Sequence, residues 1–181
     1  MIGFITNFSN VLPIIKIELY NKQSCLYFQN FMLYLILKIL KYHFKYNYKL
    51  LTCLSTFDTE NKNRFKLVFD ILSLKLNNRI RIKIQTNEMI PVYSVTKLYS
   101  GSTWWEYECW DMFGVLFLKQ KNSIRLLTDY GFQGFPLRKD FPLTGFVETK
   151  YHLLKNRVSY TNLELSQNFR IFNFKSPWDI F

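Results

Sequence analysis

The sequence predicts an α+β fold, in which a small, mostly antiparallel sheet with flanking helices is followed by a long extended C-terminal arm. Two stretches, residues 14–20 and 79–85, alternate between charged and apolar side chains, as half-buried strands do. Residues 28–41 are apolar without this alternation and favour a helix. From Thr128 onward no such period is assigned, although aromatic residues remain frequent.

The first five elements follow one another as a strand, a helix and three strands. They are expected at Ile14–Tyr20, Phe28–Lys41, Leu50–Phe57, Phe65–Leu76 and Arg79–Gln85. Asn77 and Asn78 separate the last two strands, and Asn tolerates left-handed backbone conformations, so we expect a hairpin with a two-residue type I′ turn there. The apolar run 31–40 is shorter than the ~20 residues of a membrane-spanning helix, which favours a buried or amphipathic helix.

The strand expected at 79–85 has three basic residues on one face and three isoleucines on the other. This basic face has two interpretations: a surface for phosphate or an acidic partner, or the solvated face of a half-exposed antiparallel sheet. The net charge of +11 is uneven, with +8 in residues 1–90 and +3 in residues 91–181. Charge alone does not choose between nucleic acid, an anionic membrane surface and an acidic protein as the partner.

A second helix is expected over residues 102–113, with a hydroxyl residue, Ser102 or Thr103, as its N-cap and a glycine directly after its end. Glu108 and Asp111 share one face of this helix because they are three residues apart. Two acids at this spacing are too few for a metal site. They are expected to lie near a helix N-terminus or to pair with Lys or Arg.

The cysteines and histidines predict no metal or disulfide site. Cys25, Cys53 and Cys109 are odd in number and widely spaced, which argues against a disulfide framework and indicates a reducing compartment. With only two histidines, the chain has no zinc or iron–sulfur ligand spacing. It also has no glycine-rich phosphate loop after a strand and no Ser, His and Asp set that would support catalysis.

The segment Leu126–Leu143, LLTDYGFQGFPLRKDFPL, is expected to form a kinked, extended ribbon. Two glycines permit turns, while two prolines favour extended conformations in the residues before them. Such a ribbon has much aromatic surface and few backbone partners of its own. We therefore expect a globular domain, residues 1–125, and an extended arm, residues 126–181, that docks on partner subunits.

Three long stretches of the chain carry a resemblance to a known family. They read WWEYECWDMFGVLF at 104–117, RLLTDYGFQGFPLRKDFPLTGFVE at 125–148 and LSQNFRIFNFKSPW at 165–178. In this order and spacing they resemble the 30-kDa subunit family of respiratory complex I, which comprises NADH dehydrogenase subunit 9 of mitochondrial genomes and its bacterial counterparts. The resemblance covers about residues 50–178. Where relatives carry Asp, Arg and His, this chain has Cys53, Tyr107 and Phe135.

The resemblance implies a non-catalytic core subunit of the peripheral, hydrophilic arm of NADH:ubiquinone oxidoreductase. Such a subunit scaffolds the quinone-reducing module during electron transfer from NADH to ubiquinone. The enzyme is then the whole complex, an H+-translocating NADH:ubiquinone reductase, with flavin and iron–sulfur clusters in partner subunits and no cofactor in this one. The implied partners are other peripheral-arm subunits, chiefly the 49-kDa subunit, with no nucleic acid and no membrane span.

The resemblance also implies a set of residues at the partner interface. These are Glu106, Glu108, Asp111, Arg125, Asp129, Tyr130, Phe132, Arg138, Lys139, Asp140, Phe141, Arg170 and Trp178. Aromatic anchors would supply the affinity, since burying one large apolar side chain is worth ~1.5–3 kcal/mol. Arg138 and Asp140 are expected to be desolvated interface charges rather than an acid and a base.

The expected location is the matrix side of the mitochondrial inner membrane. The start of the chain lacks an Arg- and Ser-rich transit peptide, and the composition is rich in Phe, Ile, Asn and Lys, which favours synthesis inside the organelle. The alternative is a basic RNA-binding or ribosome-associated mitochondrial protein, supported by the charge of +11 and the aromatic content. Against it, the basic excess lies mainly on one expected sheet face and the arm is nearly charge-balanced.

Overall fold

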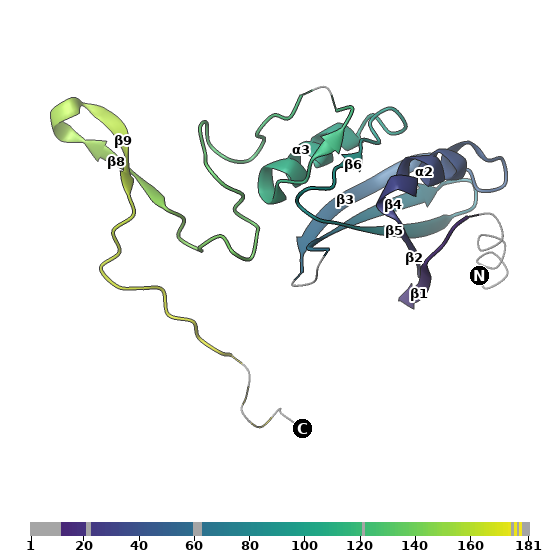
Figure 1. The fold of residues 1–181 in the computed structure, drawn as a ribbon, viewed down its shortest axis with the longest axis horizontal. Coiled ribbons are helices and arrows are strands. Elements are labelled where there is room, and N and C mark those ends of the chain that lie inside the picture. Colours follow the sequence, from purple (N-terminus) through teal and green to yellow (C-terminus); the bar gives the residue numbers. More distant parts are fainter. Residues whose placement is uncertain are drawn as a thin grey trace. The chain divides into compact units, whose positions relative to one another are not determined.

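The computed structural model describes residues 12–20, 23–59, 63–120, 122–174, 176 and 178. The chain divides into two compact units, Met1–Phe141 and Pro142–Phe181. The first contains the main sheet and its helices, and the second contains a hairpin (Figure 1). Residues 126–141 therefore belong to the same compact unit as the sheet.

The main sheet has five strands in the order β1-β2-β5-β4-β3 (Figure 1). The strands are β1 (Lys16–Tyr20), β2 (Gln23–Phe28), β3 (Leu50–Asp58), β4 (Phe65–Ser73) and β5 (Asn78–Thr86). Only the β2–β5 pair is parallel, and the other neighbours in this sheet are antiparallel. The α+β class with a mostly antiparallel sheet is confirmed.

Strand β4 shows why alternation identified the central strands. Every second residue from Phe65 to Ser73 is buried, and the residues between them are partly exposed. The predicted β4–β5 hairpin is present, but its strands pair from Ser73 opposite Asn78, so Asn78 belongs to β5. Asn77 has a φ of 45°, the left-handed conformation that Asn tolerates better than most residues. The turn is longer than the two residues expected.

Strand β2 was not predicted, because its six residues do not alternate. Positions 24–26 are all buried, as in a strand that lies inside a sheet and is covered on both faces. The helix expected from Phe28 instead begins after this strand, as a short 3-10 turn η1 (Asn30–Met32) that continues into α2 (Leu33–Tyr42). Helix α2 buries Leu33, Ile36, Leu37 and Leu40.

Helix α3 (Ser102–Phe113) lies against β3 and ends at Gly114, whose φ of 75° is left-handed. The prediction that Ser102 or Thr103 caps this helix was wrong. Gly101 occupies the N-cap position, and the Ser102 hydroxyl donates to the Tyr99 carbonyl oxygen at 2.7 Å. One core cluster joins residues of both helices to the inward-facing residues of the main sheet.

Two small sheets complete the described structure. β6 (Val92–Tyr93) and β7 (Phe117–Leu118) form a parallel pair in the first unit. In the second unit β8 (Val147–His152) and β9 (Arg157–Asn162) form an antiparallel hairpin around a 3-10 turn η2 (Leu153–Lys155). None of these strands was predicted. No helix among the described residues is both long enough and apolar enough to cross a membrane.

Candidate functional site

Asp111, near the end of α3, binds several groups of the chain that follows β7. Its side chain is fully buried, with 0% exposed. Oδ2 accepts hydrogen bonds from the backbone N–H groups of Leu126, Leu127 and Thr128, at 3.1, 2.7 and 3.0 Å. Oδ1 accepts from the Thr128 hydroxyl at 2.7 Å and from Nη1 of Arg125 at 3.1 Å. One carboxylate therefore ties the first residues of the predicted arm to α3.

These contacts also set the ionisation of Asp111. Burial favours the neutral acid and raises its pKa, but the hydrogen bonds from Thr128, Leu127 and Arg125 outweigh burial and lower the pKa to about 2. The group is therefore a carboxylate at neutral pH. With five hydrogen-bond donors around it, the buried carboxylate anchors the chain that it binds.

Arg125 and Arg138 hold the Phe135 ring between them. The centres of the two guanidinium groups lie 5.1 and 4.4 Å from the centroid of the ring. Arg138 Nε also donates to the Phe113 carbonyl oxygen at 2.6 Å, which satisfies a carbonyl at the end of α3. A Cβ atom at Gly114 would lie 2.7 Å from the Phe135 ring, so glycine is required for this close approach.

Arg64, directly before β4, is the centre of an ion network. Its Nε and Nη2 atoms donate to the two oxygens of Asp58 at 2.8 and 2.7 Å. Nη2 and Nη1 donate to Asp140 at 2.7 and 3.1 Å, and Nη1 donates to Glu88 at 2.8 Å. Glu88 also meets Arg138 Nη1 at 3.3 Å. The fork of one guanidinium thus joins three separate parts of the chain.

The charges in this network stabilise one another. The hydrogen bonds to Arg64 lower the pKa of Asp58 and of Asp140, and the same bonds raise the pKa of Arg64. Arg64 was not among the predicted residues. Its acidic partners lie 6, 24 and 76 positions away in sequence, so no local pattern identifies it.

Glu106, in the first half of α3, binds the segment that precedes this helix. It is 0% exposed, and it accepts hydrogen bonds from the Val95 N–H at 2.9 Å and the Ser94 hydroxyl at 2.8 Å. Burial raises its pKa more than these hydrogen bonds lower it. The hydrogen-bond donors to Glu106 and Asp111 thus come from this chain itself.

A comparison with protein-family models identifies the family of this chain. Residues 27–147 match the family model described as the respiratory-chain NADH dehydrogenase 30-kDa subunit. The chain belongs to this family. The likeness to the family found in the sequence is confirmed, and the matched range contains the Asp111 and Arg64 sites.

Named relatives of this 30-kDa subunit family span mitochondria-bearing and bacterial organisms. NADH-ubiquinone oxidoreductase subunit 9 of Reclinomonas americana is 48% identical over 145 residues, which cover 80% of this chain and 71% of the relative. A subunit of the NADH-quinone oxidoreductase of Sinorhizobium medicae is 51% identical over 120 residues, which cover 66% of this chain and 60% of the relative.

A solved structure shares the fold at lower sequence identity. It is described as the membrane-bound sulfane sulfur reductase, an archaeal respiratory membrane complex. The TM-score is 0.67 with 18% identity, covering 78% of this chain and 85% of the other. This likeness supports the fold alone.

The other predicted interface residues of this family member lie nearer the surface. Phe132 and Phe141 are half-buried, with ring centroids 5.9 Å apart. Tyr130 is 99% exposed. Glu108, Asp129, Lys139, Arg170 and Trp178 are exposed, and the Lys139 backbone N–H donates to Asp58. Five charged candidates instead bind groups of this chain: Glu106, Asp111, Arg125, Arg138 and Asp140. Of these five, Asp140 is exposed as well.

The basic strand face is largely occupied within the sheet. Arg81 donates to both oxygens of Asp70, at 2.7 and 3.0 Å, and Lys83 donates to the Tyr27 hydroxyl at 3.0 Å. These pairs favour the solvated sheet face over a phosphate-binding surface, and the comparisons give no support to the RNA-binding alternative. Cys25 and Cys109 are buried and Cys53 is exposed, and all three are free. The described residues contain no group of three His, Cys, Asp or Glu that could hold a metal ion.

The second unit has no buried residue among positions 142–178 that the structure describes. Val147, Tyr151, Val158 and Tyr160 lie on one face of the β8–β9 hairpin, because Tyr151 pairs with Val158 and Thr149 with Tyr160. All four of these apolar side chains are exposed. Beyond the hairpin Phe169, Ile171, Phe172 and Phe174 are exposed as well.

Proposed function

We propose that this chain is a non-catalytic core subunit of the peripheral arm of a proton-translocating NADH:ubiquinone oxidoreductase. In this role it scaffolds the quinone-reducing module, and its principal partner is the 49-kDa subunit. The flavin and the iron–sulfur clusters belong to partner subunits. The site of action is the matrix side of the mitochondrial inner membrane, and the chain is made inside the organelle.

The observation that supports scaffolding most strongly is the second unit, residues 142–181. Its described residues include many large apolar side chains and no buried residue, so they cannot hold their conformation through a core of their own. Exposed apolar surface of this extent is typical of a protein that binds a partner. Burying each large side chain against a partner contributes ~1.5–3 kcal/mol, less the cost of ordering the segment.

The first unit supports the same role, because its charged side chains bind groups of this chain and hold it in one conformation. Asp111, Glu106 and Arg64, its most strongly engaged ionisable residues, bind groups of the same chain. The contacts of Asp111 hold residues 125–128 against α3, and those of Arg64 hold Asp140 beside β4. The exposed Tyr130 and the half-buried Phe132 are then presented by a preorganised segment, which lowers the entropy lost on binding.

The experiment is purification of the complex through an affinity tag on this chain, with identification of the co-purifying subunits by mass spectrometry. Val158→Asp tests the docking role, because it places a charge in the centre of the apolar hairpin face. We expect a severalfold loss of co-purified partner subunits, since an unpaired charge in an interface costs ~2–5 kcal/mol.

Ser159→Asp is the matched control, because Ser159 is the next residue and points to the opposite face of the same strand. It should leave the yield of the complex near that of the wild type. Equal yields with both variants would contradict docking through the apolar face. A tagged chain that brings down no respiratory subunits at all would contradict the proposed function itself.

A further inference from the structure

Helix α2 is apolar on two sides, and one of them is uncovered. Leu33, Ile36, Leu37 and Leu40 face the core. On the outer side Phe31, Leu35 and Tyr42 are 63%, 53% and 65% exposed. These three follow one another at intervals of four and seven residues, so they form one stripe along η1 and α2. The exposed Lys38 lies on the same side of the helix as this stripe. Exposed apolar side chains that gather in this way are typical of a surface that binds another protein.

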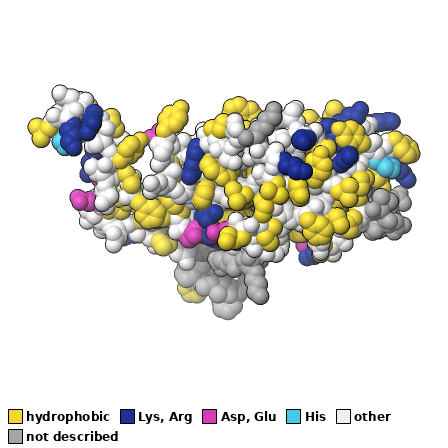
Figure 2. Space-filling view, turned by 45° about the horizontal axis from the view of Figure 1, so that its top comes forward, with side chains coloured by type: hydrophobic (Ala, Val, Ile, Leu, Met, Phe, Trp, Pro, Cys, Tyr) yellow, Lys and Arg dark blue, Asp and Glu magenta, His cyan; other side chains and the backbone are white. Residues whose placement is uncertain are grey.

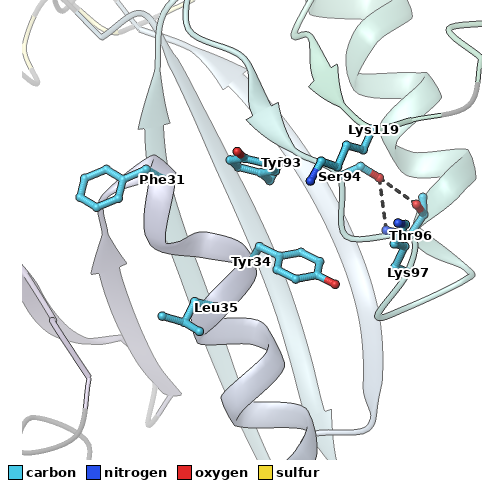
Figure 3. A pocket seen from close by; sticks show the side chains of 8 residues that line it. All are labelled: Phe31, Tyr34, Leu35, Tyr93, Ser94, Thr96, Lys97 and Lys119. Atoms are coloured by element: carbon cyan, nitrogen blue, oxygen red, sulfur yellow. Dashed lines mark hydrogen bonds between the residues drawn. The ribbon is translucent and has the colours of Figure 1, made fainter.

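A cavity of about 310 Å³ opens beside this stripe (Figure 3). Phe31, Tyr34 and Leu35 contribute one wall from η1 and α2. Tyr93, at the end of β6, lies across from them, and Lys97 and Lys119 lie on the remaining side (Figure 3). The Lys119 amine lies 5.5 Å from the centroid of the Tyr93 ring. The cavity thus combines an aromatic wall with two amines.

The wall behind the lysines is held in place by the buried carboxylate of α3. Ser94 donates to Glu106, and the Ser94 and Thr96 hydroxyls lie 2.8 Å apart. Ser94 Oγ also accepts from the Thr96 backbone N–H at 3.3 Å (Figure 3). This chain of hydrogen bonds fixes residues 94–96 before any partner arrives, so the cavity is preformed.

The residues that line the cavity include two lysines and no acid. Residues 19–57 and 89–105 include no Asp or Glu. Within the part of the chain that the structure describes, Lys38, Lys97 and Lys119 make no ion pair. By contrast, Arg64, Arg81, Arg125 and Arg138 are all ion-paired. Figure 2 shows hydrophobic and basic side chains interleaved over its right-hand end, where Figure 1 places α2.

We infer that the α2 stripe, the cavity and its two lysines form a second docking surface, which binds an acidic amphipathic segment of a partner protein. One apolar side chain of that segment fills the cavity, and its carboxylates meet Lys97 and Lys119. Two amines without an ion pair beside an apolar cavity are complementary to a segment that carries both carboxylates and an apolar side chain. This surface shares no residue with the apolar face of the β8–β9 hairpin.

Other occupants fit these observations less well. A small molecule would fill the cavity, which is at the lower end of the ~300–1,000 Å³ typical of ligand sites, but would leave the helix stripe uncovered. A lipid surface does not fill a preformed concave cavity. Nucleic acid binding favours arginine forks for phosphate, whereas the cations at this cavity are lysines.

The test is zero-length carbodiimide cross-linking of the purified complex, which joins amines to carboxylates that are in contact. We expect cross-linked peptides that connect Lys97 or Lys119 to an Asp or Glu of another polypeptide. Acetylation of the native complex, compared with the same complex unfolded in urea, should show both lysines protected. Free acetylation in the native complex overturns the inference. So does protection without a cross-link, or a cross-link only to carboxylates of this chain.

Variants separate a binding role from a folding role. Lys97→Glu combined with Lys119→Glu should abolish the cross-links and lower the amount of the cross-linked partner in the complex. Lys75→Glu, in the exposed β4–β5 turn, is the matched control and should change neither. Replacing the partner's cross-linked carboxylate by Lys should restore assembly of the double variant, and failure of this charge swap overturns the pairing.

The inference rests on the proposed function in one respect: its tests use the assembled respiratory complex as the sample. A chain that does not co-purify with respiratory subunits refutes the proposed function. A chain that co-purifies while Lys97 and Lys119 react freely with the acetylating reagent refutes only the second docking surface.

Discussion

Replacing Asp111 by Asn tests whether one carboxylate holds the start of the predicted arm. The two side chains have nearly the same shape, but the amide replaces one acceptor oxygen by an NH2 group. In Asp111 one oxygen meets three backbone N–H groups, and the other meets a hydroxyl and a guanidinium. Either orientation of the amide therefore places its NH2 group against donors.

The expected loss of stability follows from the pKa and the hydrogen bonds. Lowering the pKa of Asp111 from 3.8 to about 2 corresponds to ~2 kcal/mol of stability at neutral pH. A buried donor left without an acceptor costs ~1–3 kcal/mol. Because neighbouring donors share these acceptors and part of the segment can take up water, we expect Asp111→Asn to lower the free energy of unfolding by roughly 2–4 kcal/mol.

The measurement is urea unfolding of the full chain, followed by tryptophan fluorescence. Three of the four tryptophans, Trp104, Trp105 and Trp110, lie on α3 and report on its environment. Glu108→Gln is the matched control, because Glu108 is on the same helix and exposed, so its replacement should change stability by less than ~0.5 kcal/mol. Limited trypsin cleavage after Arg125 should accelerate in Asp111→Asn and not in the control.

The pH dependence distinguishes the carboxylate from a packing effect. A folded-state pKa below the unfolded value stabilises the protein above that unfolded value, and this stability is lost as the pH falls through the folded pKa. The difference between wild type and Asp111→Asn should therefore shrink between about pH 4 and about pH 2. A loss no larger than that of Glu108→Gln at neutral pH, or a difference that stays constant over this acid range, would refute the reasoning.

Two further variants test the ion network of Arg64 and the buried carboxylate of Glu106. Arg64→Lys should lower the free energy of unfolding by ~1–2 kcal/mol, because an ammonium group cannot bind two carboxylates in fork geometry. Arg79→Lys, at an exposed site in β5, is the control and should change this free energy little. Equal urea midpoints for the two variants would contradict the network. Glu106→Gln should lose more stability at about pH 5 than at about pH 8, because a raised folded pKa makes the wild type most stable when this carboxyl is protonated. Urea titrations at both pH values measure this difference, and the opposite order would show that the pKa of Glu106 is not raised.

The alternating strands were predictable because burial on one face leaves a direct mark on the sequence. β4 and β5 carry this mark at every second residue. β2 lacks it, since its central residues are all buried, and a short run of this kind cannot be distinguished from a helix by period alone. The β8–β9 hairpin does carry a period of two, with Val147, Thr149 and Tyr151 on one face, so the sequence contained the signal for this pair of strands.

The candidate site was predictable only as a segment. The stretch 125–141 was identified from its aromatic residues, glycines and prolines, and from its likeness to the 30-kDa subunit family, which the comparisons confirm. The sequence did not distinguish the residues that face the protein interior from those that face a partner. Asp111 and Glu106 lie in the same helix as the exposed Glu108, and all three are acids.

The amino-acid sequence alone was sufficient for the α+β class, for the positions of the alternating strands and the second helix, and for the family. These properties depend on the apolar period within single elements and on long motifs in register. The tertiary structure was needed to assign the roles of the charges. Arg64 acquires its role only when folding brings Asp58, Glu88 and Asp140 to it from 6, 24 and 76 positions away. No local pattern encodes which distant residues loop closure places together, so buried anchors and exposed docking residues become distinct only in the folded chain.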